Sequence, residues 1–261
     1  MSADDTASGA FTPRVAAASL SGEADAAWAR TAAPHVGCAF LGGIAIDEPT
    51  REAARALVAR GREEFLPADP VAFVDGQLAA LASVDVRPAV NVRSRTLDPI
   101  AEVGAVCAAH DAVLEINAHC RQDEMCAASA GETLLRAPAR LCEQVRTAAA
   151  TGAAVSVKVR TEVDGVDLPA LASRLVAAGA DAIHVDAMDS EPVVGDVVSA
   201  VPDAFVVANN GVRGRATAHE YLALGADAVS VGRPSDDPAV LRRVRRAVSE
   251  HIETGEVTPD A

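Results

Sequence analysis

With 261 residues, half of them hydrophobic, the chain can bury one large core and has the length typical of a (β/α)8 barrel, ~250 residues. No apolar run reaches the ~18 residues of a membrane-spanning helix, and residues 1–12 lack the basic and apolar segments of a signal peptide. The net charge is −14, and the 23 basic residues include a single lysine. This composition indicates a halophilic source and disfavours a nucleic-acid partner, although a halophile's general acidity weakens the second inference.

The five cysteines, Cys38, Cys107, Cys120, Cys126 and Cys142, are odd in number and contain no C-x-x-C pair. The spacing predicts neither a zinc site nor a disulfide framework, so we expect no metal and a cytoplasmic location. Three of them, Cys38, Cys107 and Cys142, lie in apolar periodic segments and are expected to fill the core.

Strand-like and helix-like segments alternate from Arg14 onward. The expected strands are 15–20, 36–41 (ending at Gly42-Gly43), 87–92, 111–117, 154–160, 181–186, 204–209 and 227–231. The expected helices are 25–33, 50–62, 70–83, a helix capped by Asp98 and ending at 109, 138–151, 168–178, 191–200, 217–224 and 238–252.

Eight such strands predict a single-domain α/β protein, a closed (β/α)8 TIM barrel over residues 14–254, with flexible ends at 1–13 and 255–261. An open, doubly wound sheet is the second choice. No G-x-G-x-x-G follows the first strand, which disfavours a dinucleotide-binding sheet.

The chemistry of the chain centres on Asn117 and Cys120, which follow the apolar run 112–116. In a parallel barrel this point lies on the face that carries active sites, where a thiol can be a nucleophile or a proton donor. The alternative from local sequence alone is a small buried cysteine beside a structural asparagine.

Other polar residues fall at the expected ends of strands or on their inward faces. They are Ser19, Asn91, Lys158, His184, Asp186, Asn209, Asn210, Gly211, Gly232 and Arg233. The residues after the seventh and eighth strands suit a phosphate group. Lys158, the chain's one lysine, lies in an otherwise buried strand, so it should face a ligand, a carboxylate or the barrel mouth.

Together these residues resemble the flavin-dependent dihydrouridine synthases, FMN barrels that reduce uridine in tRNA. Asn117, Cys120, Gly131, Leu134 and Leu135 match the family's Asn-x-Gly-Cys-Pro stretch and its downstream Gly and Leu-Leu. The sequence 158–160 resembles its Lys-Ile-Arg strand, and the stretches 18–25, 208–211 and 225–233 resemble three further motifs, so that matches run in order from about residue 15 to 234.

The resemblance implies FMN at the barrel mouth, with its phosphate on 209–211 and on Gly232 and Arg233. Ser19, Asn91 and Lys158 would contact the flavin. Cys120 would give a proton to C5 of a uracil-type base while hydride reaches C6, and Asn117 would hold the base. A nicotinamide, NADPH or NADH, would be the electron donor.

Several positions depart from the family pattern. His119 and Arg121 replace the Gly and Pro that flank the family's cysteine. The family's strand-six histidine falls on Asp186, with His184 two residues earlier as a substitute. The sequence ends one helix after Arg233, where family members continue into a helical tRNA-binding domain, so tRNA and a free pyrimidine are both considered as substrates.

Two other readings remain open. A flavin-free phosphate-binding isomerase or synthase would use Asp186 or Glu115 as acid and base and Lys158 as electrophile. A degenerate, non-catalytic barrel would bind a nucleotide or a partner protein.

Overall fold

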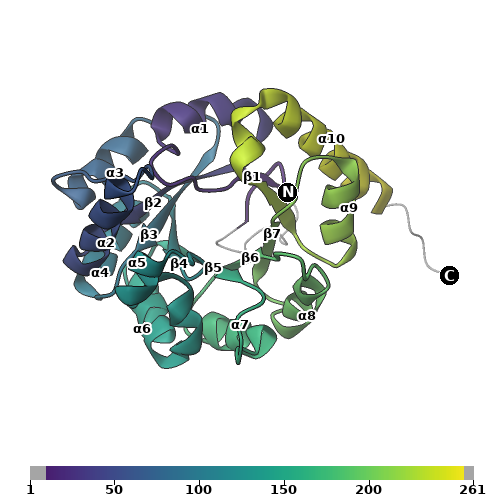
Figure 1. Ribbon diagram of the computed structural model, residues 1–261. Coiled ribbons are helices and arrows are strands. Elements are labelled where there is room, and N and C mark those ends of the chain that lie inside the picture. Colours follow the sequence, from purple (N-terminus) through teal and green to yellow (C-terminus); the bar gives the residue numbers. More distant parts are fainter. Residues whose placement is uncertain (1–9, 256–261) are drawn as a thin grey trace.

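The computed structural model describes residues 10–255, which form a closed barrel of eight parallel strands in chain order (Figure 1). The barrel closes through the pairing of Val15 with Val229 and Ala17 with Val231. The (β/α)8 prediction is therefore confirmed over the open sheet. The strands are β1 (Val15–Ala17), β2 (Cys38–Ala45), β3 (Arg87–Arg93), β4 (Val113–Asn117), β5 (Ala154–Arg160), β6 (Ala182–Asp186), β7 (Phe205–Asn209) and β8 (Ala228–Val231).

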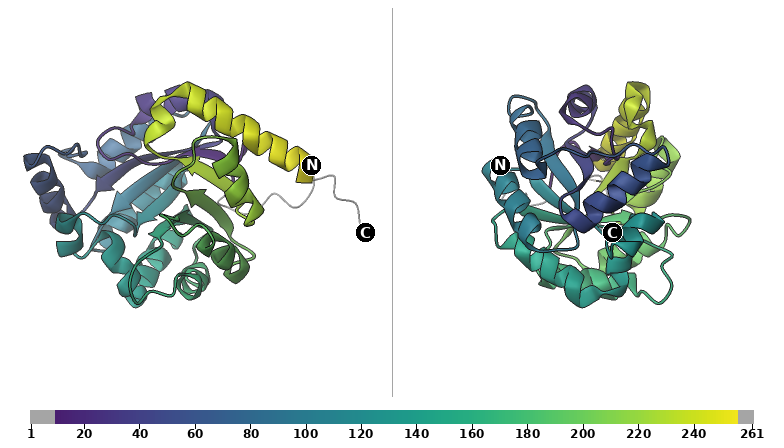
Figure 2. Two further views of the ribbon diagram at one scale, coloured as in Figure 1. Left: turned by 45° about the vertical axis from the view of Figure 1, so that its right-hand side comes forward. Right: turned by 60° about the vertical axis from the view of Figure 1, so that its left-hand side comes forward.

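Helices cover the outside of this barrel (Figure 2). They are α1 (Ala26–Ala32), α2 (Glu48–Ala59), α3 (Pro70–Ala79), α4 (Asp98–Ala109), α5 (Asp123–Ala127), α6 (Pro138–Ala149), α7 (Leu168–Ala177), α8 (Val193–Ala200), α9 (Arg215–Ala223) and α10 (Pro238–Gly255), with short 3-10 turns at Ala33–His35, Gly131–Arg136 and Arg233–Asp236. In the described part of the chain no helix is both long enough and apolar enough to cross a membrane.

The prediction for the end of the second strand was wrong. The second strand does not end at Gly42-Gly43 but continues through them to Ala45, with a bulge in its pairing between Gly42 and Ile44. A Cβ on Gly43 would lie 2.5 Å from Ser21 Oγ and 3.0 Å from the Arg93 guanidinium, so glycine lets these side chains approach.

Aspartates cap several helices, but Asp98 does not. Helix α4 begins at Asp98, and Leu97 before it makes no capping bond. Asp47 and Asp69 perform this role for α2 and α3, each accepting hydrogen bonds from backbone amides of the first turn.

The end of the expected N-terminal tail packs against the barrel. Phe11 is buried and meets Phe205 edge to face, with ring centroids 5.1 Å apart. Residues 1–9 and 256–261, which contain most of the two expected flexible ends, lie outside the described residues.

The inward side chains of the barrel change character along its axis. At the N-terminal ends of the strands they are apolar, and they form a cluster with Phe11. The strand residues of this cluster are Ala16, Cys38, Phe40, Ala89, Val113, Ala154, Ala182, Phe205, Val207 and Ala228. Two residues further along β3 to β6 and β8 the side chains become polar, and at the C-terminal ends of β3 to β7 they become charged or amide-bearing.

Cys38, Cys107 and Cys142 are buried as expected. Burial raises the pKa of Cys107 to about 12, so that this cysteine behaves as an apolar side chain.

Candidate active site at the barrel mouth

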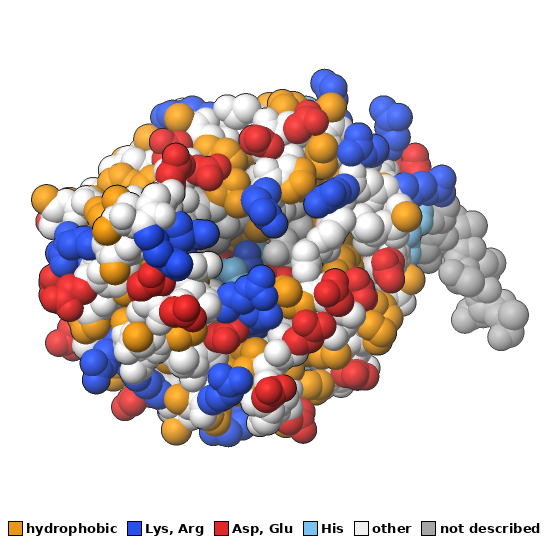
Figure 3. Space-filling view, in the orientation of Figure 1, with side chains coloured by type: hydrophobic (Ala, Val, Ile, Leu, Met, Phe, Trp, Pro, Cys, Tyr) orange, Lys and Arg blue, Asp and Glu red, His pale blue; other side chains and the backbone are white. Residues whose placement is uncertain are grey.

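A cavity of about 480 Å³ opens where the C-terminal ends of the strands meet. Figure 3 shows a hollow near the centre of this face, with Lys and Arg side chains round it and a histidine inside. Among the described residues, the cavity is lined by seven of the chain's 23 basic residues and by two carboxylates, Glu23 and Asp186. The mouth is thus cationic on a protein whose net charge is −14.

Ten of the twelve predicted site residues line this cavity. They are Ser19, Asn117, Cys120, Lys158, Asp186, Asn209, Asn210, Gly211, Gly232 and Arg233. The other two, Asn91 and His184, are fully buried one layer below it. Asn91 was expected at the end of its strand, but β3 continues to Arg93, and Arg93 takes the place at the mouth.

The loop after β4 is held by the side chain of Asn117. Its Oδ1 accepts the backbone N–H of Cys120 at 3.1 Å, and its Nδ2 donates to Asn91 Oδ1 at 2.8 Å. The amide of Asn117 is therefore used to position the cysteine loop. Cys120 itself is 8% exposed and lines the cavity, as a group that meets a ligand must.

The fixed spacing from Cys120 to Gly131 has a steric cause. Gly131 has φ +61°, and a Cβ there would lie 2.2 Å from the carbonyl oxygen of Cys120. That oxygen also accepts the N–H of Glu132 at 2.9 Å. Only glycine lets the two segments approach closely enough for this bond.

Lys158 lies on β5, next to Asn117 in the register with β4. Its side chain is 2% exposed, lines the cavity and has no hydrogen-bond or ion-pair partner among the described residues. Burial lowers its pKa, while the negative charges of Glu115 and Asp186 oppose that shift. A buried amine without a partner, facing a cavity, is a site for an electron-rich group of a ligand.

Beneath the mouth, a chain of hydrogen bonds crosses the barrel from β3 to β8. Asn91 Nδ2 donates to Glu115 Oε1 at 2.7 Å, and Glu115 Oε2 meets His184 Nδ1 at 2.7 Å and Ser156 Oγ at 3.1 Å. His184 Nε2 then meets Ser230 Oγ at 2.7 Å.

The protonation of this chain follows from its surroundings. Burial lowers the pKa of His184, while the negative charge of Glu115 opposes that shift. Burial disfavours charge on Glu115, but the charge and hydrogen bond of His184, together with Lys158 and Asn91, outweigh it and hold the pKa of Glu115 below its usual range. A carboxylate only accepts hydrogen bonds, so His184 donates from Nδ1 to Glu115, while its Nε2 is bonded to Ser230 Oγ. With both nitrogens engaged and no exposed surface, His184 does not reach the cavity.

The imidazole at the mouth belongs instead to His119. Its Nδ1 lies 3.6 Å from Asp186 Oδ2, so the two residues meet across the mouth between β4 and β6. Burial and the positive charges of Lys158 and Arg93 hold the pKa of His119 well below its usual range. No pattern in the sequence indicated this role, because His119 appeared only as a departure from the family's glycine.

Arg93 was also missed. It is 5% exposed, pairs with Glu64 at 2.6 Å, and its other terminal nitrogen donates to Ser21. It thereby ties the loop after α2 and the loop after β1 to β3. Its position two residues after Asn91, on the same face of the strand, was the available signal.

The loops after β7 and β8 provide an open backbone. Asn210 and Gly211 both have positive φ, +97° and +65°. A Cβ on Gly211 or Gly232 would meet nothing within 4 Å, so their peptide groups are accessible from the cavity. With the exposed side chain of Arg233 beside them, these loops suit a phosphate.

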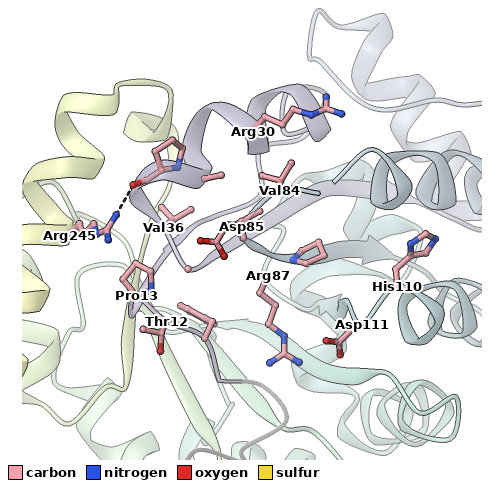
Figure 4. A pocket seen from close by; sticks show the side chains of 16 residues that line it. Thr12, Pro13, Arg30, Val36, Val84, Asp85, Arg87, His110, Asp111 and Arg245 are labelled. Atoms are coloured by element: carbon pink, nitrogen blue, oxygen red, sulfur yellow. Dashed lines mark hydrogen bonds between the residues drawn. The ribbon is translucent and has the colours of Figure 1, made fainter. Parts of the chain in front are cut away.

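A second cavity, of about 750 Å³, lies at the opposite end of the barrel (Figure 4). Its side chains include Arg87, Asp85, His110 and Asp111, and Arg245 donates to the carbonyl of Pro34 at 2.6 Å. It contains neither the predicted site residues nor a cysteine, so it is not the reactive centre.

Fold and site define a (β/α)8 barrel with a cationic, phosphate-suited mouth, an amine on β5 and a thiol in the loop after the neighbouring strand β4. The sequence match is more specific. The family model described as "Dihydrouridine synthase (Dus)" matches residues 91–259, and the chain belongs to this family. An oxidoreductase is the class of enzyme that this membership supports.

Among curated proteins, the chain is 25% identical over 233 residues to the uncharacterized protein MJ0144 of Methanocaldococcus jannaschii, covering 84% of this chain and 88% of that one. Among solved structures it resembles DHODH from Eimeria tenella in complex with ferulenol, with a TM-score of 0.68, 14% identity, and coverage of 94% and 82% of the two chains. It also resembles a mandelate oxidase mutant with a C4a-OH-FMN adduct, with a TM-score of 0.57, 17% identity, and coverage of 92% and 73%. At these identities the two structures support the fold alone.

Proposed function

We propose that the chain is an FMN-dependent oxidoreductase that reduces the C5=C6 bond of a uracil-type base, with a reduced nicotinamide as electron donor. The observation that carries the proposal is that Lys158, buried and without a partner among the described residues, lines the same cavity as Cys120, which lies in the loop after the neighbouring strand β4. Family membership and the FMN adduct named for the mandelate oxidase mutant agree with it.

The residues of the mouth fit FMN. Its phosphate would lie on the backbone of Asn210 and Gly211 and beside Gly232 and Arg233. The two glycines leave their peptide groups open to the cavity, and the arginine supplies a guanidinium. Lys158 would face the isoalloxazine, where an ammonium favours the negative charge of a reduced ring. Bound flavin would supply the hydride for the reduction.

The chain's own residues would hold the substrate and deliver the proton. Cys120 would protonate C5 of the base; in support, its residue lines the cavity and its loop is held by Asn117 and Gly131. We therefore assign Asn117 as a positioning residue, since its amide is bonded within the protein. His119, neutral and paired with Asp186, would stand at the substrate side of the mouth.

The first test is the absorbance spectrum of the purified protein, followed by mass spectrometry of the released ligand. FMN at near-equal molar ratio is expected. The matched variants are Lys158→Met, which should lower FMN occupancy, and Arg146→Gln, an exposed change on α6 that should not. A colourless protein that refuses added FMN would remove the proposal.

A second function is favoured by one observation. The lowered pKa of Lys158 is typical of lysines that form a Schiff base, as in some phosphate-binding aldolases and synthases. Borohydride would then trap a carbonyl substrate on Lys158, and the protein would bind no flavin. The buried Glu115 has its carboxylate bonded to three side chains, so in that case Asp186 is the better acid–base candidate.

A further inference from the structure

The rim of the mouth carries positive charge on two opposite sides. We propose, resting on the proposed function, that the substrate is a small unsaturated molecule with its own oxyanion, a carboxylate or a phosphate monoester, and that Arg62 and Arg121 bind this group. The cofactor's phosphate would occupy the other side, near Arg213 and Arg233.

Arg62 and Arg121 belong to segments that touch. Arg60, at the end of α2, bonds Gln122 at 2.9 Å and Glu124 at 2.7 Å in the segment after β4. Arg62 follows Arg60 by two residues, and Arg121 directly precedes Gln122. Both arginines line the cavity, are exposed, and have no side-chain partner among the described residues. They form a pair of free guanidiniums on one wall.

The barrel order places this wall across from the phosphate-suited loops. In a closed ring of eight strands β4 lies opposite β8, and β2 lies opposite β6. Arg121 follows β4, and Arg62 lies in the connection from β2 to β3, whereas Arg213 and Arg233 follow β7 and β8. A single phosphate on the β7–β8 side leaves the cations of the β2–β4 wall without a counter-charge.

The remaining charged groups do not neutralise this wall. Arg93 and Arg160 already pair with Glu64 and Glu132 inside the protein. Of the two carboxylates that line the cavity, Asp186 meets His119, and Glu23 makes no ion pair with an arginine among the described residues. Unpaired arginines that converge on a cavity repel each other, and an oxyanion that accepts from their N–H groups relieves that repulsion.

The same face argues for a small ligand over a polynucleotide. The loops after β5 and β6, residues 161–167 and 187–192, carry Glu162, Asp164, Asp189 and Glu191 and contain no basic residue. Figure 3 shows acidic side chains over α8 beside the hollow. A nucleic-acid backbone crossing this face would meet these carboxylates as well as the mouth, on a chain of net charge −14.

The test compares binding of three probes to the FMN-loaded protein by calorimetry and by perturbation of the flavin spectrum. The probes are uracil, its 6-carboxylate orotate, and uridine 5′-monophosphate. We expect at least one of the two anions to bind tenfold or more tightly than uracil. Arg62→Gln and Arg121→Gln should each weaken the binding of that anion roughly tenfold to a hundredfold without changing the binding of uracil. Arg146→Gln, with an exposed arginine outside the mouth, should change neither.

If orotate shows the preference, the oxyanion is a carboxylate. If uridine 5′-monophosphate shows it, the oxyanion is a phosphate. Equal binding of all three probes, or a preference that survives both variants, would overturn the inference. The inference would also be overturned, in favour of RNA, if a uridine-containing RNA strand bound more tightly than the monophosphate and if substitution of many surface arginines together weakened that binding. A protein that holds no FMN defeats the proposed function itself, whereas FMN binding without an anion preference defeats only this inference.

Discussion

The two ends of the barrel interior are built from the same strands but by different chemistry. At the N-terminal end, Ala, Val, Cys and Phe side chains fill the space, and Phe205 packs on Phe11. Four residues along the same inward face, β3 to β6 present Arg93, Asn117, Lys158 and Asp186 instead. One end excludes water and contributes stability, and the other presents polar groups to the cavity, among them Lys158, which has no side-chain partner among the described residues.

A layer of buried polar side chains lies between the apolar and the polar end. Glu115 and His184 have no exposed surface, yet both polar ends of each are bonded. Buried polar groups of this kind are tolerated only when satisfied, and once satisfied they fix the positions of the groups above them. Asn91 links this layer to the mouth, because its Oδ1 accepts a hydrogen bond from Asn117 Nδ2.

The largest expected effect is on the reactive end. Cys120→Ala should lower substrate reduction by about 10²–10⁴-fold, the usual contribution of a positioned proton donor, while FMN stays bound. Single-turnover reduction of substrate by the photoreduced protein measures it. Cys107→Ala, at a buried position on α4, should leave the rate per folded molecule unchanged. A Cys120→Ala protein of normal rate would show that the proton comes from another group.

A substitution at the N-terminal end of the barrel should lower the unfolding free energy without changing the active site. Phe205→Ala removes a buried ring and should cost about 3–5 kcal/mol of unfolding free energy, measured by urea titration in high salt. The FMN affinity of the molecules that remain folded should not change. Val58→Ala, 42% exposed on α2, is the control and should cost less than about 0.5 kcal/mol. An equally large loss of FMN affinity in Phe205→Ala would mean that the two ends are not separable.

Between the ends, Glu115→Gln should cost about 1–3 kcal/mol at pH 7, because the new NH₂ would face donors on Ser156 and His184. The pKa of Glu115 is lower in the folded than in the unfolded chain. Its stabilisation is therefore complete above its ordinary value of 4.5 and is lost as the pH falls through the folded pKa.

The unfolding free energy measured from pH 7 to pH 3.5 should accordingly fall less steeply in Glu115→Gln than in the parent. Glu143→Gln, an exposed change on α6, should retain the parent's slope. Parallel curves for parent and Glu115→Gln would show that folding does not lower the pKa of Glu115.

The smallest effect concerns the loops of the mouth face. Asp47 caps α2 and also accepts the backbone amides of Arg95 and Thr96 at 2.7 and 2.8 Å, joining the loops after β2 and β3. Asp47→Ala should cost about 2 kcal/mol, the upper part of the range for a cap. Asp69→Ala removes an exposed cap of α3 alone and should cost about 1 kcal/mol or less. Equal costs would show that the bonds between the two loops contribute nothing.

The sequence by itself determined the class of fold and most of the mouth. Alternating apolar segments require a parallel sheet with helical crossovers, and the ends of such strands meet at one face, so ten of the twelve predicted residues converge there. The steric demand for Gly131 was likewise visible as a fixed spacing, although its cause, the Cys120 carbonyl, was not.

Only the tertiary structure decided which polar residues reach the cavity. Asn91 and His184 were expected at the flavin, yet their layer lies one strand repeat below it, where Glu115 and Ser230 bind them. Conversely, His119 and Arg62 reach the mouth because loops from distant parts of the chain meet there, and Arg93 reaches it because β3 continues two residues past Asn91. The period of a strand gives the side on which a residue lies, but its depth depends on the stagger of eight strands round a closed barrel, which no single segment encodes.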